Sequence, residues 1–146
     1  MEPEYNPNGT LRTTSVHYDA VKAFTVAMGQ PVGEDITSVE VGDLLEMRLD
    51  LIEEEFIEVS EELPGFTADH AGGAIDKAAF TKELADLLYV VHGMAVTFGL
   101  PIDEVFERVH RSNMSKLDDN GKPIYREDGK VLKGPNYEKP KLDDLF

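Results

Sequence analysis

Two groups of carboxylates stand at a spacing that would let them hold a divalent cation together. Glu54, Glu55 and Glu58 fall within one short stretch, and Glu83 and Asp86 follow Glu58 after an interval of 24 residues. Partly buried carboxylates cost several kcal/mol each unless they are neutralised, paired or bound to a metal. Because the chain has no cysteine, the group is an all-oxygen donor set. Mg²⁺, with Mn²⁺ as a second possibility, is the cation such a set suits.

Helices must position these side chains, because acids three or four residues apart lie one turn from each other on a helix. We predict one helix from about Asp43 to just before Pro64 and another from about 76 to 98, joined by a loop over residues 64–75. Their apolar residues recur at spacings of four and three: Leu45, Leu49, Ile52, Phe56, Val59 and Leu63 in the first, and Phe80, Leu84, Leu87, Val91, Met94 and Phe98 in the second. Two matched seams predict an antiparallel helix pair.

The cations of these two helices are too few to neutralise the acids. Arg48, Lys77 and Lys82 are available, and none is placed to serve all four inward acids. The alternative is a solvated face, since exposed like charges one turn apart cost only about 0.2–0.5 kcal/mol per pair. We accept that alternative for Glu53 and Glu61, and we predict metal binding by four acids: Glu55, Glu58, Glu83 and Asp86.

Two further helices complete the predicted fold, an all-α antiparallel four-helix bundle. Ser15 is a suitable N-cap for a helix over 16–28, which Gly29 and Pro31 would end. Asp103 is expected to cap a fourth helix, which ends near Leu117. The apolar residues that this fourth helix is expected to bury are Val105, Phe106, Val109 and Met114.

The ends of the chain are expected to lie outside the bundle. Residues 1–15 are predicted to be a flexible or wrapping arm, 16–117 the helical catalytic domain, and 118–146 a tail that packs on the bundle or a neighbouring subunit. Within the tail, two β-prone runs flank Asp128-Gly129, which predicts a short C-terminal hairpin.

Charge narrows the range of partners. The formal net charge is −15 over 146 residues, which argues against a nucleic-acid polymer or an anionic membrane as the partner. Residues 34–62 hold 12 of the 29 acids and one base, whereas nine of the 14 bases lie from Arg108 onward. An acidic middle and a cationic end could form a metal site and a phosphate clamp, or simply a solvated surface. Because the first residues lack the pattern of a secretory signal, we expect a cytoplasmic protein.

The acids also carry a family resemblance. Glu54-Glu55-Phe56-Ile57-Glu58 followed by Glu83-Leu84-Ala85-Asp86 resembles the EExxE…ExxD signature of the MazG-like, all-α nucleoside triphosphate pyrophosphohydrolases, a superfamily that includes phosphoribosyl-ATP pyrophosphohydrolase. The stretch from Arg111 to Lys116 resembles a bacterial and phage subgroup. The resemblance spans roughly residues 16–140. It implies Mg²⁺-dependent cleavage of a nucleoside triphosphate to the monophosphate and pyrophosphate, with dUTP or a non-standard or pyrimidine deoxynucleotide favoured.

The resemblance also implies roles for individual residues. Glu55, Glu58, Glu83 and Asp86 would hold the metal, and Glu54 would orient and deprotonate the attacking water. Asn113 and Lys116 would hold phosphate oxygens, with Lys133 and Arg126 as further candidates from the tail. Phe24 and Gln30 would lie against the nucleobase, although Phe24 suits the core equally well.

Rival interpretations remain open at this level. A di-iron bundle needs Glu-x-x-His on two helices, and Glu107-Arg108-Val109-His110 is the single match. Phosphoribosyl-ATP pyrophosphohydrolase is the rival among enzymes, and a non-catalytic helical interaction module is the rival among binding proteins. Because so short a bundle rarely closes a nucleotide pocket alone, we expect a homodimer or homotetramer. The pattern does not fix the base, the sugar, the number of metal ions or the phosphorus attacked.

Overall fold

The computed structural model describes residues 3–66 and 73–146, which group into two compact units. Ser15–Leu100 form the first, named here the three-helix unit, and the segment ending at Thr14 forms the second with Pro101–Phe146, named the terminal unit. This grouping differs from the predicted arm, domain and tail, because the fourth helix joins the two terminal segments. Residues 67–72 of the predicted loop lie outside the described residues.

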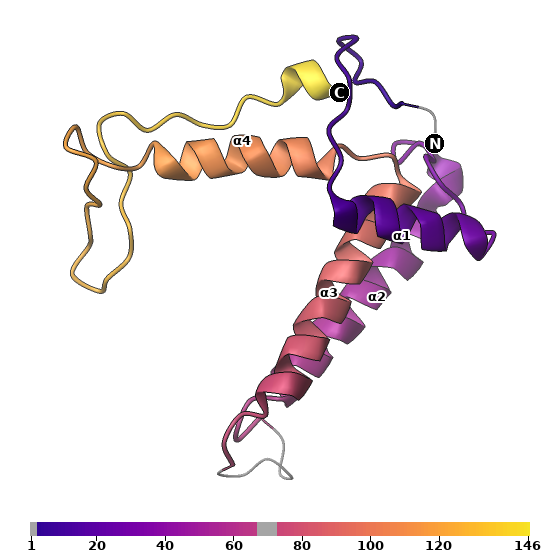
Figure 1. Cartoon of the computed structure of the whole chain (residues 1–146), viewed down its shortest axis with the longest axis horizontal. Helices are drawn as coiled ribbons and strands as arrows, with labels where there is room; N and C mark the ends of the chain where they lie inside the picture. The colour runs from indigo at the N-terminus through magenta and orange to yellow at the C-terminus, as the bar shows by residue number, and fades with distance from the viewer. Residues whose placement is uncertain (1–2, 67–72) are drawn as a thin grey trace. The chain divides into compact units, whose positions relative to one another are not determined.

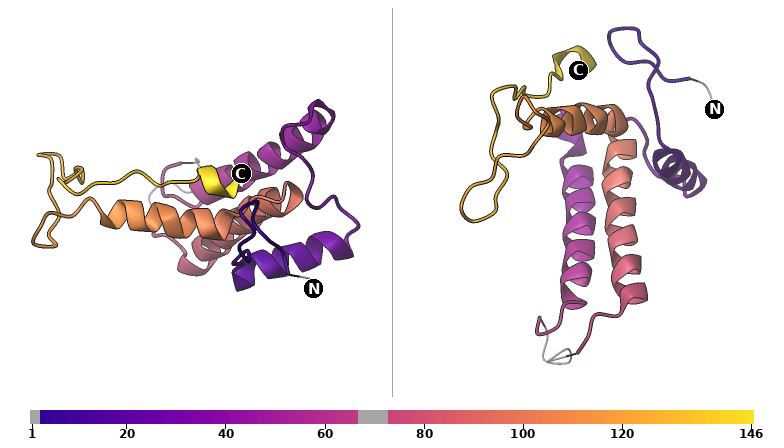
Figure 2. Two further views of the ribbon diagram at one scale, coloured as in Figure 1. Left: turned by 90° about the horizontal axis from the view of Figure 1, so that it is seen from above. Right: turned by 60° about the vertical axis from the view of Figure 1, so that its left-hand side comes forward.

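The three-helix unit contains α1 (Val16–Ala27), the short 3₁₀ helix η1 (Val39–Val41), α2 (Gly42–Glu61) and α3 (Lys77–Thr97). Helices α2 and α3 pack along their length and run in opposite directions, and α1 packs on α3 (Figures 1 and 2). The terminal unit contains α4 (Ile102–Met114) and the 3₁₀ helix η3 (Asp143–Leu145). The described residues hold four α-helices and no strand, so the predicted all-α class and the antiparallel pair are confirmed.

Local capping explains where the helices begin and end. The Ser15 side chain accepts a hydrogen bond from the Tyr18 backbone, and the Asp76 carboxylate accepts from the first turn of α3. Gly29 and Gly99 follow α1 and α3 with φ values of 66° and 61°. This left-handed conformation favours glycine and closes each helix with backbone bonds to its last carbonyls. These ends confirm the positions predicted from the sequence.

The predicted seam of α2 is only half correct. Leu49, Phe56 and Leu63 have exposed fractions of 53%, 58% and 41%, so they do not lie in the helix interface. Arg48 is buried instead, and Glu55 is partly buried. Helix α2 is therefore rotated about its axis from the predicted orientation, and its polar edge turns toward α3.

The prediction for the fourth helix was also partly wrong. Its N-cap is Pro101, and Asp103 lies in the first turn, where a carboxylate interacts favourably with the helix dipole. Phe106 and Met114 are exposed to 68% and 52%. The side chains of α4 whose hydrogen bonds reach the tail, Arg108 and Ser112, are polar.

Hydrogen bonds and ion pairs connect the segments of the terminal unit. Nη1 of Arg108 donates to the Lys141 carbonyl at 2.7 Å, and the same guanidinium pairs with Asp144 and with Glu104. Asn6 of the N-terminal segment donates to Glu104 at 2.7 Å. The guanidinium of Arg108 lowers the pKa of Asp144 to about 2. Arg108 thus connects α4 with the C-terminal segment.

The predicted C-terminal hairpin is present in reduced form. Tyr125 and Val131 make one antiparallel bridge around the Asp128-Gly129 turn, and no strand extends from it. As for membrane insertion, none of the described helices taken singly has the length and apolar content to cross a bilayer. Only α3 and α4 taken together as one broken segment reach that threshold.

Candidate active site

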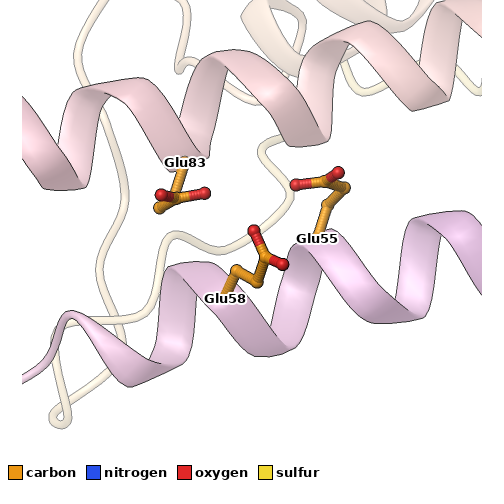
Figure 3. A group of neighbouring side chains, drawn as sticks. All are labelled: Glu55, Glu58 and Glu83. Atoms are coloured by element: carbon orange, nitrogen blue, oxygen red, sulfur yellow. The ribbon is translucent and has the colours of Figure 1, made fainter.

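Three carboxylates from two helices meet between α2 and α3. Glu55 and Glu58 project from α2 and Glu83 from α3, and the three side chains point toward one another (Figure 3). One oxygen of each lies within 4.8 Å of the other two. We call these three residues the acid cluster. One oxygen from each residue could bind the same cation, and hard divalent ions such as Mg²⁺ prefer oxygen ligands of this kind.

The acid cluster is electrostatically strained without a cation. Oε2 of Glu55 is inaccessible to solvent and has no hydrogen-bond partner among the described residues. Desolvation, followed by the nearby charges of Asp86 and Glu83, raises the pKa of Glu55. A hydrogen bond with Glu83 and the charge of Glu55 raise the pKa of Glu58. Each effect disfavours the ionised form, and a bound cation would reverse it.

Asp86, the fourth predicted ligand, lies outside the acid cluster. Its carboxylate pairs with Nζ of Lys82 at 2.7 Å, and Lys82 also contacts Glu83 at 3.2 Å. Asp86 is still close enough to raise the pKa of Glu55. Because the Lys82 side chain is 63% exposed, this pairing is weak and easily exchanged. Of the three cations available in these helices, Lys82 is the one that pairs with Glu83 and Asp86.

Glu54, the predicted base, is exposed on α2 beside the acid cluster. It lines a shallow groove together with Glu58, so its carboxylate is open to water while its neighbour Glu55 turns inward. Glu54 therefore faces solvent one residue before Glu55, whose carboxylate turns toward the acid cluster.

The predicted substrate-binding residues are distributed over both units. In the three-helix unit the Phe24 ring packs edge-on against Tyr89, with centroids 5.7 Å apart, and Gln30 accepts a hydrogen bond from Arg48. Sequence reasoning had treated Arg48 only as a possible partner of the acids.

In the terminal unit, Nζ of Lys116 donates to the Asn113 side chain at 2.9 Å, so these two predicted residues lie together. Lys133 lies over the Tyr137 ring at 4.6 Å, and Arg126 pairs with Asp128. The amide of Gly134, next to Lys133, donates to the Lys116 carbonyl at 3.0 Å, so Lys133 follows Lys116 closely in space, whereas Arg126 is paired within its own turn.

A cationic cleft in the terminal unit was not predicted. It has a volume of about 310 Å³ and lies between α4 and the tail. Its lining consists of Arg108, Arg111, Ser112, Ser115, Glu138, Lys139, Pro140 and Lys141. The one signal in the sequence was the excess of bases after Arg108.

Comparison with known proteins agrees with the acid pattern. A sequence model of the family described as phosphoribosyl-ATP pyrophosphohydrolase matches residues 21–113. No curated protein matches the chain. Among solved structures, a protein from Exiguobacterium sp. 255-15, provisionally assigned as an NTP pyrophosphohydrolase, is similar with 21% identity and a TM-score of 0.44. That similarity covers 88% of this chain and 90% of the other.

Proposed function

This chain belongs to the phosphoribosyl-ATP pyrophosphohydrolase family, and we propose that it hydrolyses a nucleoside triphosphate to the monophosphate and pyrophosphate with Mg²⁺ at the acid cluster. The family assignment confirms the predicted resemblance and the predicted class of enzyme, a pyrophosphohydrolase. The substrate and the metal are the proposal.

One observation carries the metal assignment. Three carboxylates approach within 4.8 Å of one another, and a buried oxygen of Glu55 has no partner among the described residues. Like charges this close are unfavourable unless protons or a cation intervene. An all-oxygen donor set fits Mg²⁺, and Mn²⁺ shares that preference. Glu55, Glu58 and Glu83 would hold the ion, and Asp86 would join them by releasing Lys82.

The residues around the acid cluster would divide the chemistry. Bound Mg²⁺ would neutralise phosphate charge and make water more acidic. Glu54, exposed beside the acid cluster, would accept a proton from the attacking water. The oxygen of that water would bond to a phosphorus atom of the anhydride between the α- and β-phosphoryl groups as the bridging P–O bond breaks. The products are the monophosphate and pyrophosphate, and Glu54 would then release its proton to solvent. Asn113 and Lys116 of the terminal unit, which contact each other at 2.9 Å, stay the predicted phosphate-binding residues.

The substrate has two candidates. The resemblance of the Arg111–Lys116 stretch to a bacterial and phage subgroup favours dUTP or another non-standard or pyrimidine deoxynucleotide. The description of the matched family favours phosphoribosyl-ATP instead. Both contain the phosphoanhydride bond that the acid cluster would serve.

A steady-state panel tests the proposal. The purified chain is given the common ribo- and deoxynucleoside triphosphates, dUTP and phosphoribosyl-ATP, with Mg²⁺, with Mn²⁺ or with a chelator. Pyrophosphate and orthophosphate are scored separately. We expect pyrophosphate, dependence on the metal, and the highest kcat/KM for dUTP or another pyrimidine deoxynucleotide. Release of orthophosphate, or turnover in excess chelator, would contradict the mechanism, and a best rate with phosphoribosyl-ATP would select the second substrate.

We also propose that the chain works as a homodimer or homotetramer. Helix α2 exposes Leu49 and Phe56, which are seven residues apart, and Leu63 just after the helix is 41% exposed. Leu84 and Leu88 of α3 are 44% and 46% exposed. Apolar rows of this length are typical of surfaces that bind another protein. Light scattering at working concentration should give a multiple of the chain mass, and Phe56→Glu should reduce that mass. A monomeric mass for the unaltered chain would exclude this assembly. The cytoplasmic location stays a prediction.

A further inference from the structure

Arg48 of α2 is buried in an unusual way. Arg48 is only 6% exposed, whereas arginine is rarely buried in proteins unless its donors are paired. A desolvated guanidinium whose donors lack acceptors is destabilising. The burial of Arg48 therefore needs an explanation that packing alone does not give.

The partners of Arg48 satisfy only some of its donors. Nη2 donates to Oε1 of Gln30 at 3.2 Å, and Nε has no acceptor among the described residues. No carboxylate pairs with Arg48 among those residues, although α2 is rich in acids. Desolvation lowers the pKa of Arg48. The guanidinium thus retains donors for an oxygen acceptor that is absent from the chain itself.

The position of Arg48 relates it to the acid cluster. Arg48 precedes Glu55 by seven residues, which is two turns or about 10.5 Å along the axis, and both lie on the side of α2 that turns inward. On α3 the guanidinium lies against Gly93, because a Cβ there would stand 3.3 Å from Nη1. A nucleotide whose phosphates lie at the acid cluster would extend its base over about this length.

Aromatic side chains flank this end of the site. Tyr89 lies one turn before Gly93 on α3, and it contacts Phe24 of α1. Both rings are exposed, to 40% and 44%, and Gln30 is exposed as well. Aromatic faces that are open to solvent can stack on a base. The three-helix unit therefore has two aromatic rings that could stack on a nucleobase and a guanidinium that could donate to the edge of that base.

We propose that Arg48 is a specificity-determining residue that donates to the carbonyl oxygen at position 4 of a pyrimidine or position 6 of a purine base. A guanidinium has donors and no acceptor, so it attracts the oxo group of uracil or hypoxanthine and disfavours the amino group of cytosine or adenine. Arginine makes the corresponding paired contact with the oxo edge of guanine in DNA. This inference rests on the proposed function and narrows it to oxo bases.

The test compares substrates that differ only in this group. The ratios of kcat/KM for UTP over CTP and for ITP over ATP are measured for the unaltered chain and for Arg48→Met, with Lys77→Met, an exposed cation on α3, as the matched control. We expect both ratios to exceed one by roughly ten- to hundredfold, to fall toward one in Arg48→Met and to persist in the control. A merely structural Arg48 would leave the ratios unchanged.

Two further variants keep the test valid if Arg48→Met folds poorly. Arg48→Lys keeps the charge but loses the planar fork, and Gln30→Ala removes the exposed residue that orients the guanidinium; each should lower both ratios. Preference for CTP and ATP would overturn the inference. An equal loss for every nucleotide in Arg48→Met would overturn it too, because Arg48 would then bind phosphate. If the unaltered chain cleaves triphosphates with ratios near one, this inference fails while the proposed function stands; no cleavage at all removes both.

Discussion

Replacing Glu55 by glutamine should change the stability of the protein in opposite directions with and without metal. The substitution removes one negative charge from the acid cluster and keeps the shape of the side chain. Glu55 and Glu83 place oxygens within 4.8 Å of each other. At an effective dielectric constant between about 20 and 80, two charges at that separation repel by about 1 to 3 kcal/mol. The metal-free Glu55→Gln protein should be more stable by an amount of that order.

In a melting experiment this difference is measurable. A stability change of 1 kcal/mol shifts Tm by roughly 2–4 °C for a chain of this size, so Glu55→Gln should melt several degrees higher in chelator. Magnesium at one thousand times its Kd should stabilise the unaltered chain by about 4.1 kcal/mol. The variant, which lacks one ligand, should gain much less. The order of the two melting temperatures should therefore reverse when Mg²⁺ is added.

Glu53→Gln provides the matched control. Glu53 is an exposed acid on the same helix and lies outside the acid cluster, so its replacement removes the same charge without the same repulsion. We expect its effect to stay within about 0.5 kcal/mol in either condition. A metal-free Glu55→Gln protein that melts below the unaltered chain, or one that keeps the full response to Mg²⁺, would refute the reasoning.

Three other outcomes are expected. Glu54→Gln should abolish turnover in the steady-state assay and leave the Mg²⁺-induced rise in Tm largely intact; equal loss of both would contradict its role as the base. Asp86→Ala should weaken the Mg²⁺ response in the same melts, and a metal-free Tm that drops sharply would instead mark its contact with Lys82 as structural. The pKa values of Glu55 and Glu58 are raised in the folded state. In the pH range from the unfolded pKa, near 4.3, up to the raised pKa, the folded state therefore binds more protons than the unfolded state. The free energy of unfolding in chelator should consequently fall as pH rises through this window; in urea titrations Glu55→Gln should show a shallower fall, and an unchanged slope would count against the raised values.

Several features followed from the sequence because their causes are local. A helix N-cap depends on one side chain and the next three amides, so Ser15 marked the start of α1. Gly29 and Gly99 marked helix ends, because few other residues adopt their backbone conformation. The spacing of Glu55 and Glu58 fixed their common side of α2, since a helix repeats every 3.6 residues. The antiparallel α2–α3 pair, which brings Glu83 to that side, followed from two apolar patterns of equal period.

The rotation of α2 about its own axis was decided only by tertiary structure. Periodicity gives the angles between side chains within one helix, but the face that turns toward a neighbour depends on the packing of both helices at once. The exposure of Phe56 and the burial of Arg48 follow from that joint packing, in which Gly93 of α3 leaves space for the guanidinium. The pairing of Asp86 with Lys82 likewise depends on side-chain conformations that spacing does not specify. Sequence thus determined which residues share a helix face, and the fold determined what each face meets.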